Sequence, residues 1–278
     1  MKNHFQSPLP FQGQKRRFLK QFKEALKGFS NNATYVDLFG GSGLLAHCVK
    51  QHYPDARVIW NDYDDYAERL AAIPQTNVLV AELRGFLVDE PRKQRMPESL
   101  RQKVLEVVKQ HEEHYGFVDY VTISSSLLFS GTYAVNYEQL AKEAFYNRIK
   151  MGEYDASGYL TGVERVQYDY RELYERYKGT DTVFLVDPPY LSTDTSTYKS
   201  ENYWRLRDYL DVLSVLDGSN YFYFTSNKSQ IVELCEWIET RTSTGNPFSG
   251  AIMNTTAQQL NYNAGYTDIM LYKYVGVE

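Results

Sequence analysis

The tetrapeptide Asp187-Pro188-Pro189-Tyr190 carries the clearest chemical pattern in the chain and follows the apolar run 183–186. Each proline fixes its own φ angle and removes a backbone donor, so carbonyl groups at this corner can act as acceptors. A carboxylate, an acceptor carbonyl and an aromatic face together match a flat ring that bears an exocyclic amino group. We therefore predict that Asp187 and the Pro188 carbonyl each accept one amino hydrogen, while Tyr190 stacks on the ring.

A glycine-rich turn, Phe39-Gly40-Gly41-Ser42-Gly43, stands between an apolar run and a helical pattern. Glycines let the backbone turn sharply and approach a ligand closely, and the N-terminus of the following helix offers free N–H groups. Gly41 and Gly43 also satisfy a dinucleotide pattern with an acid, Asp62, about 20 residues further on. Asp62 could accept hydrogen bonds from ribose hydroxyls. This pattern predicts an adenosine-type cofactor, either a nicotinamide dinucleotide or S-adenosylmethionine.

Alternating strand and helix patterns place both motifs at one edge of a sheet. The first strand, helix and second strand are expected at 35–39, 44–51 and 57–60. The pattern returns after residue 165 with strands, helices and a closing strand at 183–186, 204–216, 221–225, 231–239 and 267–274. This order predicts an α/β, Rossmann-like parallel sheet with helices on both faces, in which ligands bind at the carboxyl ends of the strands.

The middle of the chain interrupts this alternation. Residues 98–113 read as an exposed, charge-rich helix, and residues 115–165 are rich in Tyr, Ser and Gly. Long connections inside a compact fold are usually functional. We predict a catalytic domain made of residues 1–84 and 166–278, with residues 85–165 inserted as a mainly helical lobe.

Composition narrows the class of protein further. A chain of 278 residues allows one large domain, or one domain with a lobe. Its two cysteines and five scattered histidines predict neither a disulfide framework nor a metal site. No apolar run is long enough to cross a bilayer, and the N-terminus lacks an export signal, so we expect a cytoplasmic protein without membrane contact.

Charge is distributed unevenly along the chain. The net charge is −5, yet residues 1–30 carry seven Lys or Arg against one Glu, hence 7 − 1 = +6. A second basic cluster is Arg92-Lys93-Gln94-Arg95. Such clusters either form solvated helical faces or contact phosphates. The 25 tyrosines would suit stacking against nucleic-acid bases.

Taken together, these motifs resemble those of the Dam-type DNA adenine-N6 methyltransferases, whose target-recognition region lies between the cofactor motif and the Asp-Pro-Pro-Tyr motif. Residues 11–15 are similar to the family's Phe/Trp-x-Gly-x-Lys element, which implies that Phe11 and Lys15 contact S-adenosylmethionine. The other cofactor contacts that the resemblance implies are Asp37, Phe39, Gly41, Gly43, Asp62, Asp169 and Asp187. The family more often has Glu-Pro-Phe where this chain has Asp37-Leu38-Phe39.

The resemblance implies transfer of a methyl group to the N6 amino group of an adenine flipped out of duplex DNA. The catalytic residues would be Asp187, Pro188, Pro189 and Tyr190. The DNA contacts that we expect are Lys15, Arg16, Arg92, Lys93, Arg95, Ser130, Tyr133, Asn136 and Tyr198. Ser130, Tyr133 and Asn136 belong to the segment 124–137, which we expect to read bases or separate strands. Phe11 and Tyr198 are further candidates for the adenine pocket.

Other functions stay open at this point. An RNA adenine-N6 or DNA cytosine-N4 methyltransferase would use the same chemistry, although Asp at position 187 leans toward adenine in DNA. A nicotinamide-dependent oxidoreductase would explain the glycine turn but not the Asp-Pro-Pro-Tyr motif. A DNA-binding module with a decayed site would not need all of these chemical groups. The expected partners are double-stranded DNA and, in a restriction-modification pair, a cognate restriction endonuclease, with no obligate protein partner.

Overall fold

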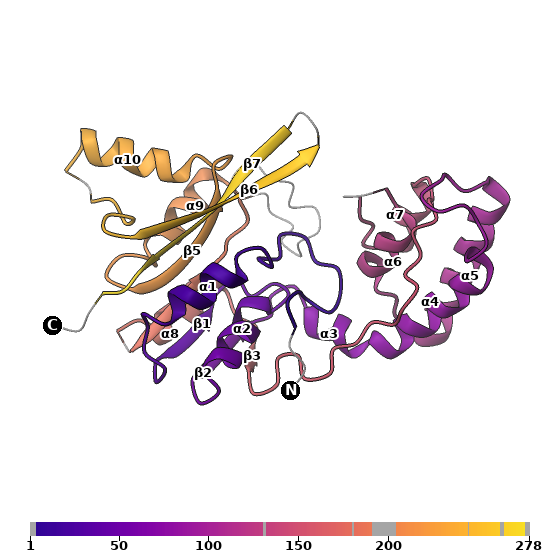
Figure 1. Ribbon diagram of the computed structural model, residues 1–278, viewed down its shortest axis with the longest axis horizontal. Helices are drawn as coiled ribbons and strands as arrows, with labels where there is room; N and C mark the ends of the chain where they lie inside the picture. The colour runs from indigo at the N-terminus through magenta and orange to yellow at the C-terminus, as the bar shows by residue number, and fades with distance from the viewer. Residues whose placement is uncertain are drawn as a thin grey trace. The chain divides into compact units, whose positions relative to one another are not determined.

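The computed structural model describes residues 4–129, 132–179, 181–190, 204–243, 245–261 and 264–275 (Figure 1). The chain forms two compact units. The first, here called the helical unit, consists of Met1–Gly13 and Asp65–Tyr159. The second, the sheet unit, consists of Gln14–Asp64 and Leu160–Glu278. Each unit is described separately below.

The sheet unit is built on seven strands in the order β3-β2-β1-β4-β5-β7-β6. Their bounds are β1 Thr34–Asp37, β2 Arg57–Asn61, β3 Glu164–Val166, β4 Thr182–Val186, β5 Asn220–Ser226, β6 Ile252–Asn261 and β7 Ala264–Lys273. The strands β3, β2, β1, β4 and β5 pair in parallel, whereas β7 is antiparallel to both β5 and β6. The predicted α/β, Rossmann-like fold is thus confirmed.

Side-chain alternation along β5 explains how helices cover both faces of this sheet. Tyr221 and Tyr223 join a buried apolar cluster with residues of α8 (Tyr170–Tyr177), α9 (Leu206–Leu213) and α10 (Ile231–Arg241). Phe222 and Phe224 point the other way, toward Phe22 of α1 (Leu19–Leu26), with ring centroids 4.8 and 6.1 Å apart. The helix α2 (Leu44–His52) packs on α1, β1 and β2. Both faces of the central strands are therefore buried, as their apolar sequences predict.

The helical unit contains five helices among the residues described. They are α3 Tyr66–Ala71, α4 Ile73–Leu87, α5 Glu98–Tyr115, α6 Tyr120–Leu127 and α7 Tyr137–Lys142. The charge-rich helix expected at 98–113 is present as α5, and it buries Val104, Leu105, Val108 and His111 along one side. The lobe expected from the sequence begins at residue 85, whereas the compact unit begins at Asp65. Recognition of the target by 85–165 stays a prediction.

The described helices were compared with the length and hydropathy that a membrane-spanning helix needs. Within the described ranges, none of them is both long and apolar enough to cross a membrane.

Candidate active site

The glycine turn joins β1 to α2 and is held tightly against β2. Gly41 and Gly43 adopt positive φ angles of 46° and 74°, a backbone conformation that glycine takes without steric cost. The Gly43 N–H donates to the Gly40 carbonyl at 2.7 Å and closes the turn. A Cβ atom on Gly40 would lie 2.2 Å from Trp60 Cδ1, so a larger residue does not fit there. The turn thus needs its glycines for both conformation and packing.

Asp37, the last residue of β1, is a buried carboxyl group beside this turn. Its side chain is 1 % exposed, and among the described residues neither of its oxygens has a hydrogen-bond partner. The pKa of Asp37 is raised to about 8, mainly by burial and to a lesser extent by the nearby Asp187. Lys15 and the amides of Ala46 and Phe39 offset only part of this effect on the pKa. A buried carboxyl of this kind would be stabilised by a cationic or hydrogen-bonding ligand.

Asp187 follows β4 directly and forms an ion pair with Lys15. The Lys15 Nζ atom lies 2.6 Å from Asp187 Oδ2, and the two side chains are 8 % and 17 % exposed. The same Nζ atom lies 5.0 Å from the centroid of the Tyr190 ring. Burial raises the pKa of Asp187 to about 6, with Asp268 adding to the rise and Lys15 opposing it. The cation therefore favours the ionised form of Asp187 near neutral pH.

Asp62 lies just beyond β2 and is completely buried. Arg165 of β3 donates from Nε to Asp62 Oδ2 at 2.7 Å. Asn61 donates to the carbonyls of Leu38 and Tyr168 and accepts from the Tyr168 N–H, each at 2.9 Å. These bonds fix the ends of β1 and β2 and the segment after β3 in one arrangement. The predicted ribose acid is therefore rigidly placed at the carboxyl edge of the sheet.

An aromatic cluster borders the same edge. The Phe39 ring lies 4.9 Å from the Tyr170 ring and 5.8 Å from Trp204, measured between centroids. Trp204 lies 5.2 Å from Tyr209, whose hydroxyl donates to the Tyr190 carbonyl at 3.4 Å. The cluster thus connects the glycine turn with the residue that ends the Asp-Pro-Pro-Tyr motif.

The structure brings Lys15, Asp37, the glycine turn, Asp62 and the Asp-Pro-Pro-Tyr motif together in the sheet unit. Two residues that were predicted to contact the cofactor, Asp169 and Phe11, make different contacts. Asp169 caps α8 by accepting the Arg171 N–H at 2.8 Å, and its side chain is 54 % exposed. Phe11 belongs to the helical unit, where its ring meets that of Tyr66 edge-on at 5.6 Å.

The predicted DNA contacts are spread over both units. Arg16, Arg92, Lys93 and Arg95 are exposed, and Arg92 also donates to the Ile149 carbonyl at 2.7 Å. Tyr133 is half-buried, while Asn136 caps α7 by accepting the Gln139 N–H at 2.8 Å. Lys15 is buried and ion-paired, unlike the exposed arginine that follows it. Ser130 and Tyr198 lie outside the described residues.

Sequence reasoning missed three residues of this site. Arg165 belongs to a three-residue strand whose first two side chains, Glu164 and Arg165, are exposed and polar, so the sequence gives no strand signal there. Asp268 lies opposite Ser226 in the β5–β7 pair and acts on Asp187, but antiparallel pairing is not visible in the chain order. Trp60 falls on the expected second strand, yet only its contact with Gly40 reveals its role in the turn. Within the described ranges, no group of three His, Cys, Asp or Glu side chains is arranged to hold a metal ion.

Comparison with known proteins identifies the family. Residues 11–232 match the D12 class N6 adenine-specific DNA methyltransferases. A curated protein of Haemophilus influenzae named "Putative methyltransferase" is 35% identical over 280 residues, which cover 97% of this chain and 92% of that protein. The matched region includes Lys15, the glycine turn, Asp62 and the Asp-Pro-Pro-Tyr motif. The chain therefore belongs to the D12 class N6 adenine-specific DNA methyltransferases, and it is a DNA adenine methyltransferase.

Proposed function

We propose that this enzyme uses S-adenosylmethionine to methylate the N6 amino group of an adenine that has been flipped out of double-stranded DNA. The observation that carries this proposal is the Lys15–Asp187 ion pair at the Asp-Pro-Pro-Tyr motif, 2.6 Å long and largely buried. An ionised, oriented carboxylate at this position can accept a hydrogen bond from the exocyclic amino group of adenine. Adenine in DNA is the target named by the family.

The cofactor fits the residues at the edge of the sheet. S-adenosylmethionine would supply a methyl group on a positively charged sulfur. Its methionine end bears an ammonium group, which matches the buried Asp37 carboxyl that has no hydrogen-bond partner among the described residues. The glycine turn at Gly41 and Gly43 lets the backbone approach a ligand, and Asp62 would accept ribose hydroxyls. We assign Phe11, Phe39 and Asp169 to the cofactor on the family motif.

The catalytic residues act on an amino nitrogen that is a poor nucleophile, because its lone pair is delocalised into the ring. Asp187 and the Pro188 carbonyl would each accept one N6 hydrogen and draw the nitrogen toward a tetrahedral geometry. The charge of Asp187 would also offset the positive charge that develops on the nitrogen before a proton leaves. Tyr190 would stack on the flipped ring and offset part of the cost of unstacking it, about a few kcal/mol.

DNA would be held by the basic segments. The exposed side chains of Arg16, Arg92, Lys93 and Arg95 would contact phosphates, and the segment 124–137 would read bases or separate strands. Residues 85–165 would then be the target-recognition region. In a restriction-modification pair, its partner would be a cognate restriction endonuclease. The enzyme, of bacterial or phage type, would act on DNA in the cytoplasm.

A labelled-methyl transfer assay tests this function. Purified protein is incubated with S-adenosylmethionine labelled in its methyl group and with unmethylated plasmid DNA. We expect label in the DNA with the wild type and a loss of more than about a thousandfold with Asp187→Ala, because the oriented acceptor is lost. Calorimetry should show that Asp187→Ala loses much less affinity for the cofactor than it loses rate of methyl transfer. A variant that stays active would contradict the role of Asp187, and a wild type that does not bind S-adenosylmethionine would contradict the cofactor.

A further inference from the structure

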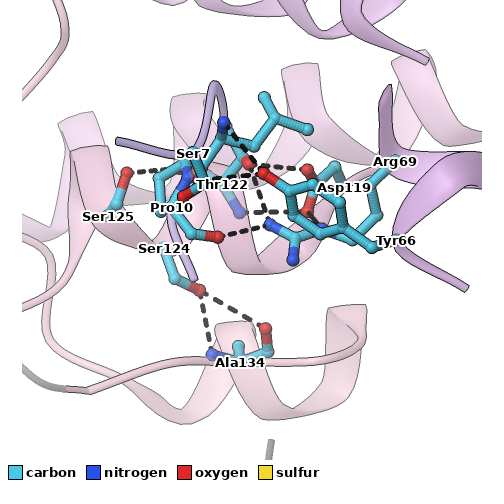
Figure 2. A network of polar contacts seen from close by, with 10 residues as sticks. Ser7, Pro10, Tyr66, Arg69, Asp119, Thr122, Ser124, Ser125 and Ala134 are labelled. Carbon is cyan, nitrogen blue, oxygen red and sulfur yellow. Dashed lines mark hydrogen bonds and ion pairs between the residues drawn. The ribbon is translucent and has the colours of Figure 1, made fainter. Parts of the chain in front are cut away.

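Residues 7–11 of the helical unit are held by a buried polar network that takes no part in the proposed chemistry. Figure 2 shows this network, in which side chains of α3 bond to the N-terminal segment and Arg69 also bonds to Asp119 and to Thr122 of α6. The segment leads directly into the predicted cofactor element, residues 11–15, and the chain enters the sheet unit at Gln14.

Arg69 of α3 is the centre of the network. Its Nε atom donates to Asp119 Oδ1 at 3.0 Å, and its Nη2 atom donates to the Pro10 carbonyl at 2.8 Å and to Thr122 Oγ1 at 3.3 Å (Figure 2). The guanidinium group also lies 5.1 Å from the centroid of the Tyr66 ring. A planar, forked cation can make all of these contacts at once, whereas a single ammonium nitrogen cannot.

Asp119 fixes the direction of this guanidinium. The Arg69 and Asp119 side chains are 14 % and 1 % exposed, so their ion pair is shielded from water. Asp119 also caps α6, because its side chain accepts the Thr122 N–H at 3.1 Å and the Thr122 hydroxyl at 2.5 Å. Removal of either partner would leave a buried charge without its counter-ion. The arginine is therefore held in one orientation before any ligand arrives.

Tyr66 also binds the N-terminal segment, through two hydrogen bonds to Leu9. Its hydroxyl accepts the Leu9 N–H at 3.1 Å and donates to the Leu9 carbonyl at 3.2 Å. The Ser7 hydroxyl donates to the same carbonyl at 2.9 Å. Beyond Pro10, the Phe11 ring packs edge-on against Tyr66 at 5.6 Å between centroids. Arg69 and Tyr66 thus bond to the backbone just before Phe11, and Tyr66 also contacts the Phe11 ring.

We propose that Arg69 is a positioning residue for cofactor binding, acting through the Pro10 carbonyl and the residue that follows it, Phe11. This inference rests on the proposed function, in which Phe11 contacts S-adenosylmethionine. Arg69 would hold the segment in its binding conformation, so that ligand binding need not bear the entropy cost of ordering it.

Arg69→Lys tests this inference, with Arg84→Lys as a matched control. Lysine keeps the positive charge beside Asp119 but cannot also hold the Pro10 carbonyl. Arg84 of α4 likewise donates to two backbone carbonyls, Lys150 at 3.1 Å and Gly152 at 3.3 Å, and neither belongs to residues 7–11. We expect Arg69→Lys to raise the Kd for S-adenosylmethionine about tenfold in calorimetry without DNA, and Arg84→Lys to change it less than about twofold.

A double-mutant cycle with Phe11→Leu separates positioning from general stability. If Arg69 acts through Phe11, Arg69→Lys should change the Kd much less in the Phe11→Leu background than in the wild type. Equal changes in both backgrounds, or equal changes from Arg69→Lys and Arg84→Lys, would overturn the inference. A wild type that does not bind S-adenosylmethionine would instead overturn the proposed function, and this inference with it.

Discussion

The charge on Asp187 depends on the groups around it. Burial and Asp268 raise the pKa of Asp187 and so favour the neutral acid, while Lys15 lowers it and favours the carboxylate. Tyr223 interacts electrostatically with Asp187. Burial raises the pKa of Tyr223, so its hydroxyl stays neutral and adds no charge beside Asp187. Lys15 is thus the cation that keeps the proposed acceptor of the amino hydrogens ionised. We therefore propose for Lys15 a second role, beyond the cofactor contact that the family motif implies.

Lys15→Gln should shift the pH dependence of methyl transfer. The pKa of Asp187 is about 6 with Lys15 in place, and removal of this cation raises it. The acid limb of the kcat profile should therefore move to higher pH, so that the loss of rate is greater at about pH 6 than at about pH 8.5. Lys15→Arg keeps the charge and should show a smaller shift. An equal loss of rate at every pH would contradict this electrostatic role.

Asp37→Asn should change how stability depends on pH. Burial raises the pKa of Asp37 to about 8, so the folded protein keeps a proton that the unfolded chain loses above about pH 4. Asp37 therefore makes the free energy of unfolding fall between about pH 4 and pH 8, by up to about 1.4 kcal/mol per pH unit. Urea denaturation across this range should give a flatter profile for the variant, and parallel profiles would refute the prediction.

The sequence predicts those elements around the site whose pattern lies within a few consecutive residues. The glycine turn and the Asp-Pro-Pro-Tyr corner each follow an apolar strand, so their meeting at one sheet edge follows from parallel topology. The short strand β3 and the pairing of β7 with β5 were not predictable, because they depend on contacts between distant segments. For the same reason, the Arg165–Asp62 and Asp268–Asp187 interactions had no sequence signal. The helices α3 (Tyr66–Ala71) and α4 (Ile73–Leu87) were also missed, since no motif drew attention to them.

Gly40→Ala should disrupt the turn, with Gly85→Ala as its control. A Cβ atom on Gly40 would lie 2.2 Å from Trp60 Cδ1 and 2.8 Å from the Asn61 carbonyl oxygen. We expect a loss of about 1–3 kcal/mol in the free energy of unfolding, as overpacking typically causes. Gly85 lies within α4, where an added Cβ atom would meet nothing within 4 Å, so alanine should stabilise the protein there by about 0.5–1 kcal/mol. Urea denaturation measures both, and equal effects would contradict the packing argument.

At the scale of the whole molecule, the chain is acidic, but it has two local clusters of basic residues, at 1–30 and 92–95. The net charge of −5 would repel DNA, so binding depends on local groups of Lys and Arg. Lys93 and Arg95 are exposed and lie in the helical unit, whereas the residues proposed for the cofactor lie in the sheet unit, apart from Phe11. Phosphate binding and methyl transfer should therefore be separable by mutation.

The double variant Lys93→Gln, Arg95→Gln should weaken DNA binding without affecting the cofactor. Each lost phosphate contact should reduce the salt dependence of log K by about 0.9 on duplex DNA. Fluorescence anisotropy at several salt concentrations would measure this slope. Lys109→Gln provides the control, because this side chain is 60 % exposed on α5 and outside both clusters. A double variant with an unchanged slope would exclude these residues from the DNA contact.

The most direct test of the central claim is to identify the modified base. Unmethylated plasmid DNA would be incubated with S-adenosylmethionine and either the wild type or Asp187→Ala, digested to nucleosides and analysed by mass spectrometry. We predict N6-methyladenine with the wild type and none with the variant. N4-methylcytosine from the wild type, or N6-methyladenine at wild-type levels from Asp187→Ala, would contradict the account.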